Sequence, residues 1–276
     1  MRKRFWTLSL LAVFLIAAGS GVATAMPSLA GPTGIVSVPT AAIAPPDQLQ
    51  TALTYGSQSM YGGLVDVDYW ALNVLAGVAD TAELWGAYAL ADQETPTASE
   101  TAHMWAFGGK YQFAREPEDT ASLAVGASLE KWSDSMFMYG AMTDVDIIKA
   151  YIVATKDFTP MGGESWEWSN GGTQTLGTLG LMYIDVDPDI GDSESLTKPF
   201  VGLEFIGAGG TTLGLEYRWK DDDIDEDAVF SAVIRHPFSP EWELEVGTTN
   251  AGPGGIGLDD QDIFVRVGYI IPMAGY

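Results

Sequence analysis

The chain has 276 residues, no cysteine, and a net charge of −24 that arises from 37 acidic and 13 basic residues. Without cysteine there can be no disulfide framework and no cysteine-ligated zinc site, and the acidic charge argues against nucleic-acid binding, which needs a basic face. A hydrophobic fraction of 47% excludes intrinsic disorder. An ordered chain remains, with enough apolar surface for a core or for contact with lipid.

The first 25 residues have the three parts of a secretory signal peptide. Basic residues open the chain at Arg2–Arg4, an apolar run covers Leu8–Ala18, and Ala23–Ala25 is a small-residue cleavage motif. The alternative, an N-terminal membrane anchor, needs an apolar run of roughly 20 residues. We therefore predict export, with residues 1–25 removed. Since no later run reaches 18 apolar residues, the mature chain could span a membrane only as a closed β-barrel.

Residues 26–46 are too rich in glycine and proline to form a lipid-facing strand. We expect this segment to lie at the periplasmic mouth of a barrel or to pack inside it as a plug. The barrel itself is predicted to occupy residues 47–276.

From about Gln48 onward, apolar and polar residues alternate with the period of a β-strand that has two different faces. Most segments run for about 10 residues, the length of a tilted membrane strand, whereas strands in soluble proteins average nearer 5–6. The segments that we expect to form strands are 48–57, 67–79, 82–92, 102–114, 121–131, 146–157, 174–185, 198–207, 211–220, 228–236, 241–250 and 262–272. The sequence thus predicts an all-β fold, a transmembrane antiparallel β-barrel of about twelve strands.

Aromatic residues lie on the apolar faces of these strands, mostly toward their ends, as in the girdles of membrane barrels. They are Trp105, Tyr111, Phe113, Tyr183, Tyr217, Trp219, Trp242 and Tyr269. A soluble secreted sandwich or lipocalin-like barrel would bury these side chains in a core or a ligand site. That fold is the alternative prediction.

The connections alternate between short turns and longer loops, as they do between the periplasmic and outer sides of a barrel. The exception is 158–173, a long connection in a short position that could hide a further strand. The longer loops, at 58–66, 93–101, 132–145, 186–197, 221–227 and 251–261, contain many acidic residues and no Lys or Arg. They are either solvated outer loops or an acidic rim that attracts divalent cations.

No motif for catalysis, a cofactor or a metal stands out. The acidic runs that begin at Asp185 and Asp221 have the i, i+2, i+4 spacing of a calcium loop but lack its glycine and closing glutamate. An outer-membrane acyl hydrolase would need a Ser–His pair, for which only His103 and His236 are available. We predict a protein that is not an enzyme.

The polar faces of the strands would line the barrel lumen. The residues that this register places inside are Gln50, Lys110, Gln112, Glu130, Glu204, Glu216, Arg218, Glu243, Glu245 and Arg266. Five acids against three bases would give an open lumen a mild preference for cations. Twelve strands enclose a narrow bore, which could equally be closed by side chains.

The run after the signal peptide, with Gly31, Thr33, Gly34 and Pro39-Thr40-Ala41, resembles the opening of YjbH-type outer-membrane β-barrel proteins. The segment Val74–Ala89 resembles a hairpin that many outer-membrane barrels share. The resemblance covers less than a fifth of the chain, and the family members are much longer. It implies a place in the outer membrane and an association with exopolysaccharide. The aromatic C-terminal residue, Tyr276, looks like the signal for the barrel-assembly machinery, although Pro272 and Gly275 interrupt it.

Together these patterns predict a barrel in the outer membrane of a diderm bacterium. Its expected role is a narrow channel or an export-linked barrel for polysaccharide or small solutes. Outer-membrane lipid and the assembly machinery are the expected partners, with divalent cations at the acidic loops and no nucleic acid.

Overall fold

The computed structural model describes residues 27–29, 31–60, 64–96, 99–116, 120–138, 141–159, 174–189, 191–220, 227–251 and 257–273. The predicted signal peptide, the acidic run 221–226 and the C-terminal Tyr276 therefore lie outside the described residues. The strands are β1 (Gln48–Met60), β2 (Val65–Ala79), β3 (Ala82–Glu94), β4 (Ser99–Ala114), β5 (Ser122–Met138), β6 (Ala141–Asp157), β7 (Gln174–Pro188), β8 (Glu194–Ile206), β9 (Thr212–Arg218), β10 (Val229–Pro237), β11 (Trp242–Ala251) and β12 (Gly257–Pro272).

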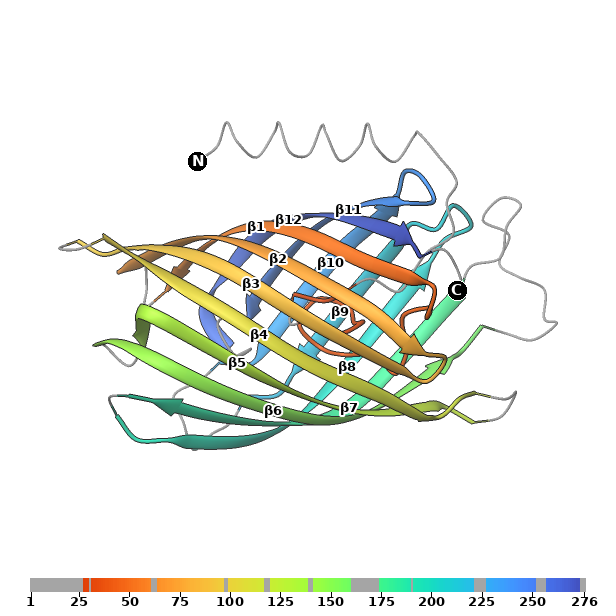
Figure 1. Cartoon of the computed structure of the whole chain (residues 1–276), viewed down its shortest axis with the longest axis horizontal. Coiled ribbons are helices and arrows are strands. Elements are labelled where there is room, and N and C mark those ends of the chain that lie inside the picture. Colours follow the sequence, from red (N-terminus) through yellow and green to blue (C-terminus); the bar gives the residue numbers. More distant parts are fainter. Residues whose placement is uncertain are drawn as a thin grey trace.

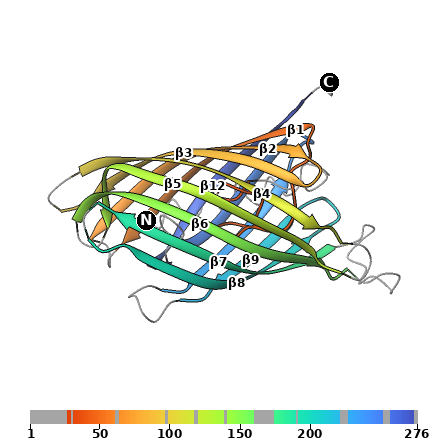
Figure 2. The ribbon, with the colours of Figure 1, turned by 60° about the horizontal axis from the view of Figure 1, so that its bottom comes forward.

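The twelve strands form one closed antiparallel barrel (Figure 1). Each strand pairs with its neighbours in chain order, and β1 closes the ring by pairing with β12, with Gln50 opposite Ile270. Figure 2, turned by 60°, shows the strands strongly inclined around the same closed wall. Closure leaves no unpaired sheet edge, which is the condition for placing strands in lipid.

The predicted all-β fold and number of strands are confirmed, but the long loop predicted at 132–145 is wrong. Strands β5 and β6 continue through most of this stretch, and Met138 pairs with Ala141 at its end. The alternation of apolar and polar residues is lost in this stretch, so the segments predicted at 121–131 and 146–157 are shorter than the strands that form. β6 pairs directly with β7, so no further strand lies between them in the wall, and most of the connection 158–173 lies outside the described residues.

The outer surface of the barrel is mainly apolar and aromatic. Near the short connections, Trp242 packs on Tyr269 with ring centroids 4.4 Å apart, and nearer the longer ones Tyr55 packs on Trp70 at 4.8 Å. Along β4, the exposed Trp105 and Phe113 are eight residues apart, which is a rise of roughly 20 Å in a strand tilted by about 40°. This separation approaches the roughly 25 Å apolar band of outer-membrane barrels.

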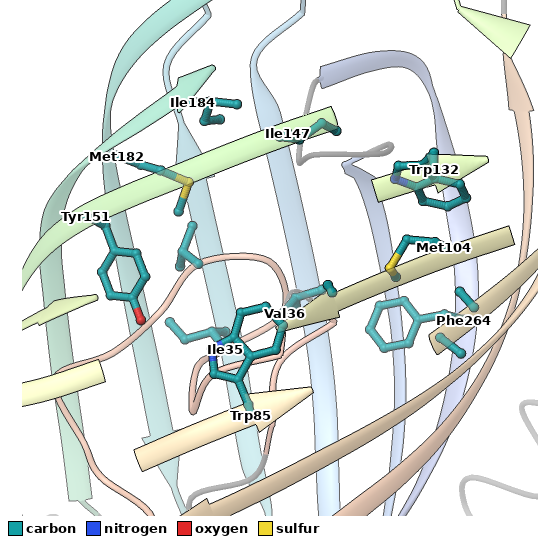
Figure 3. Close-up of a cluster of buried hydrophobic side chains, with 14 of the residues drawn as sticks. Ile35, Val36, Trp85, Met104, Trp132, Ile147, Tyr151, Met182, Ile184 and Phe264 are labelled. Carbon is teal, nitrogen blue, oxygen red and sulfur yellow. The ribbon is translucent and has the colours of Figure 1, made fainter. Parts of the chain in front are cut away.

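Along most of the wall, buried inner positions alternate with exposed outer ones. In β9, for example, Thr212, Glu216 and Arg218 are buried whereas Leu213 and Tyr217 are exposed. The bore contains both charged side chains and an apolar cluster (Figure 3). Within the described ranges, no helix is long and apolar enough to cross a membrane.

Candidate functional site: the bore and its plug segment

Residues 27–29 and 31–46, here called the plug segment, lie inside the barrel (Figure 1). Ile35, Val36 and Val38 have no solvent exposure, and Figure 3 shows Ile35 and Val36 in one apolar cluster with Trp85 of β3. The segment folds back on itself through the bridges Pro27–Thr33 and Gly34–Pro39. Its described residues form no ladder with the barrel strands, so inward-facing side chains hold it in place.

Glu216 of β9 is one anchor of the plug segment. Its carboxylate accepts hydrogen bonds from the backbone N–H groups of Val36 (3.0 Å), Ser37 (2.9 Å) and Val38 (3.1 Å), and from the Ser37 hydroxyl. Consecutive N–H groups that converge on one anion form a nest. Hydrogen bonds to a charged group contribute about 1.5–3 kcal/mol each, which makes Glu216 a strong attachment point.

A second anchor joins β3 and β4 to the same segment. Glu83 accepts from the N–H groups of Thr33 (3.0 Å) and Ala44 (2.9 Å). Its partner Lys110, 3.0 Å away, donates to the carbonyl oxygens of Thr33 (3.1 Å) and Thr40 (3.0 Å) and to the Thr33 hydroxyl. Both side chains are fully buried. The ion pair therefore satisfies its own charges while it binds both ends of the Thr33–Thr40 turn.

A third anchor is the network around Arg235 of β10. Its Nε lies 2.9 Å from Glu245 and 3.3 Å from Glu243, and Glu204 lies 3.8 Å from Nη1. The same guanidinium donates to the carbonyl oxygens of Gly34 (3.3 Å) and Ile35 (3.0 Å). One buried cation thus holds three carboxylates and the backbone of the plug segment.

The network continues to β12 and to the start of the plug segment. Arg266 bonds to Glu245 and donates to the carbonyl oxygen of Pro27. Asn73 of β2 donates to Ser28 (2.8 Å) and Gln112 of β4 donates to Ala41 (2.8 Å). The contacts therefore come from most of the circumference of the barrel.

Glycines in the wall leave room for the plug segment. A Cβ atom at Gly202 would lie 2.3 Å from Ile35 Cδ1, and one at Gly214 would lie 2.7 Å from Ile35 Cγ2. Ile35 thus fills a notch between β8 and β9 that exists only because these positions lack side chains. Within the plug segment, Gly31 has φ of 108° and packs on the ring of Trp85, a conformation that other residues rarely adopt.

The ten side chains predicted to face the lumen are all buried on the inner face. The structure brings Lys110, Gln112, Glu216, Glu245 and Arg266 together around the plug segment, directly or through one partner. Glu204 and Glu243 reach it through Arg235. Glu130 lies apart, bound to Lys149 (2.7 Å) and Trp132 (2.6 Å). Arg218 and Gln50 make no hydrogen bond to the described residues of the plug segment.

Five buried charged residues of the bore were not predicted from the sequence, namely Glu83, Lys149, Lys198, Arg235 and Asp262. Alternation could have found Arg235, since the exposed Phe230 and Ile234 fix the outer face of β10. With these residues, the described interior holds seven buried acids and six buried bases. The mild negative interior expected from the sequence is therefore replaced by a nearly balanced one, which removes the basis for a cation preference.

The hydroxyl groups that contact the two histidines belong to a tyrosine and a threonine, not to a serine. His103 Nδ1 lies 2.8 Å from the Tyr88 hydroxyl on the outer surface, and His236 Nδ1 lies 2.8 Å from Thr211 Oγ1. In the part of the chain that the structure describes, no group of three or more His, Asp or Glu side chains is placed to hold a metal ion.

Comparison of the sequence with protein-family models and with curated proteins finds no match. Among solved structures, the chain is similar to an outer membrane channel from Pseudomonas putida F1, with 13% identity and a TM-score of 0.50 over 82% of this chain and 96% of that one. It is also similar to the KdgM porin, with 13% identity and a TM-score of 0.47 over 80% and 98% of the two chains. A phospholipase from the Salmonella typhi outer membrane follows, with 11% identity and a TM-score of 0.43 over 83% and 92%. The likeness concerns the fold, and the chain has the architecture of an outer-membrane β-barrel.

Proposed function

We propose that the protein is an outer-membrane channel whose bore is closed by the plug segment at rest. The observation that carries the proposal is the contrast between the two faces of the wall. Outside, large apolar side chains such as Leu72 and Phe107 are 48% and 54% exposed. Inside, thirteen buried acidic and basic side chains would suit a path for hydrophilic solutes once the plug segment moves.

The soluble alternative is not favoured by the position of the tryptophans. A soluble β-protein would bury Trp105, Trp219 and Trp242, but they are 40%, 43% and 43% exposed on the outside of the barrel. An exposed apolar surface that surrounds the molecule is far larger than the patches of a few hundred Å² that soluble monomers tolerate. Lipid is the solvent that this surface fits.

We extend the proposal to polysaccharide export on the resemblance to the YjbH-type family. In support, the residues that carry the resemblance are those that seat the plug segment: Gly31 packs on Trp85, and Thr33 binds Glu83 and Lys110. The motif would then mark a plug and not a strand. Divalent cations at the acidic loops and recognition by the assembly machinery remain part of the same proposal.

The proposal is tested by reconstitution of the mature protein into planar bilayers. A closed barrel should migrate faster on a denaturing gel before boiling than after it. We expect small or rare conductance steps that are lost after heat denaturation. A folded, membrane-inserted barrel without any conductance, even after removal of residues 27–46, would refute the channel function.

A charge on the outer face tests the membrane placement separately. Leu72 lies in the middle of β2 and faces outward, so Leu72→Arg should reduce the free energy of folding into lipid vesicles by about 2–4 kcal/mol. Leu72→Phe is the control and should change it little. In a soluble barrel the same arginine would be solvated, and an unchanged unfolding midpoint for Leu72→Arg would contradict a lipid-facing surface.

A further inference from the structure

Arg218, the last residue of β9, is a buried cation in the bore, and within the described residues no acidic side chain forms a hydrogen bond or an ion pair with it. Its exposure is 1%, yet Nε and Nη2 have no hydrogen-bond partner. Among the described residues, Nη1 donates one long hydrogen bond, to the Met182 sulfur at 3.9 Å. Burial of an unpaired guanidinium costs several kcal/mol, so this side chain is placed where an anion would be stabilised.

The neighbours of Arg218 do not supply that anion. Phe200 pairs with Arg218 across the β8–β9 ladder, and the next inward residue along β8 is a base, Lys198. The nearest acid on its own strand is Glu216, whose carboxylate is occupied by three N–H groups and a hydroxyl of the plug segment. On the far side of Met182, Lys149 is held by Glu130.

Arg218 lies on the solute side of the plug segment. Along β9, the chain leaves the short Gly207–Thr211 turn, passes Glu216 at the plug segment, and reaches Arg218 one inward position farther on. On a path from the longer loops, the level of Arg218 therefore comes before that of the Glu216 anchor. The guanidinium presents a planar fork that matches two oxygens of one oxyanion.

We propose that Arg218 anchors a binding site in the bore for a solute that carries a carboxylate or phosphate group. The site deepens the proposed channel function and rests on it for its biological meaning, because it names the charge of the solute that the bore receives. Phe200 and Met182, themselves buried, are the apolar side chains that border the site. A neutral or cationic solute would leave the charge of the guanidinium uncompensated.

The test measures the thermal unfolding midpoint of the folded barrel in detergent. Inorganic phosphate, glucuronate and neutral glucose are titrated at constant ionic strength with chloride as the balance. We expect phosphate or glucuronate, but not glucose, to raise the midpoint in a saturable way, since a ligand that binds only the folded state stabilises it. If phosphate gives the larger shift, the site prefers a free oxyanion, and if glucuronate does, it prefers a carboxylated sugar.

Substitutions test whether the rise of the unfolding midpoint depends on the Arg218 side chain. Arg218→Met should lower the affinity for the anion at least about tenfold, because a charge-assisted hydrogen bond contributes at least that factor to binding. It breaks no ion pair and should fold. Arg218→Lys keeps the charge without the fork and should have an intermediate effect. Lys131→Met, which removes an exposed charge paired with Asp146, is the matched control and should keep the wild-type response.

The outcomes separate the site from the channel. No saturable shift in the wild type, or the same shift in Arg218→Met, would overturn the anion site whatever the conductance. A shift that depends on Arg218 in a barrel without conductance would retain the site and refute only the channel.

Discussion

Replacing Glu216 by glutamine should release the plug segment and open the barrel. The amide offers one acceptor oxygen where the carboxylate binds three backbone N–H groups and the Ser37 hydroxyl, and its NH₂ group would face donors. A loss of about 3 kcal/mol would shift the ratio of closed to open barrels by about a hundredfold. Single-channel recording should show this shift as long-lived openings that the wild type lacks.

The matched control for this experiment is Glu130→Gln. Glu130 is also a buried glutamate of the bore, but it binds Lys149 and Trp132 and not the plug segment. Its substitution should leave the channel closed. Equal opening by both variants would mean that loss of any buried charge loosens the barrel, and the anchoring role of Glu216 would be wrong.

Arg235→Met should have the largest effect on stability. The substitution leaves Glu204, Glu243 and Glu245 buried together, with only Arg266 still bonded to Glu245. Loss of one partner of a buried ion pair costs about 3–5 kcal/mol. We expect the free energy of unfolding from detergent or vesicles, measured by urea titration, to fall by about this amount.

The cause of this loss can be separated from simple loss of packing. Glu204→Gln and Glu243→Gln, introduced together into Arg235→Met, remove two of the uncompensated carboxylates and should restore part of the stability. Lys131→Met breaks an exposed pair and should cost less than about 1 kcal/mol. If neutral glutamines do not improve Arg235→Met, repulsion among the buried acids is not the reason for its instability.

The alternation of apolar and polar residues predicted the wall of the barrel well, because strands in contact with lipid need an apolar outer face. Every strand in the membrane needs one apolar face, so residues such as Leu213 and Tyr217 mark the outside and Glu216 and Arg218 the inside. This requirement for an apolar face ends where the strands leave the membrane. The extension of β5 and β6 to Met138 and Ala141 was therefore missed.

The contents of the bore were harder to predict, since the contacts join residues far apart in the chain. Glu216 meets Ser37 across 179 residues and Arg235 meets Ile35 across 200, and no local pattern records such pairs. The glycine and proline content of residues 26–46 excluded a lipid-facing strand but left both the periplasmic mouth and the bore open. The notch at Gly202 and Gly214 that receives Ile35 had no signal in one sequence, because glycine also occurs in strands for other reasons.

The central claim, that the plug segment closes the bore, is tested most directly by tying the segment to the wall. The chain has no cysteine, so Ile35→Cys with Gly214→Cys introduces the only possible disulfide. A Cβ atom added at Gly214 would lie 2.7 Å from Ile35 Cγ2, and one further bond of about 1.5 Å puts the two Cβ atoms within reach of a disulfide.

Conductance of this cysteine pair is then measured in the Glu216→Gln background before and after reduction. The account predicts that the oxidised protein is as closed as the wild type and that reduction produces the long openings of Glu216→Gln. Equal conductance in the two states, with the disulfide verified by mass spectrometry, would show that the plug segment does not control the bore.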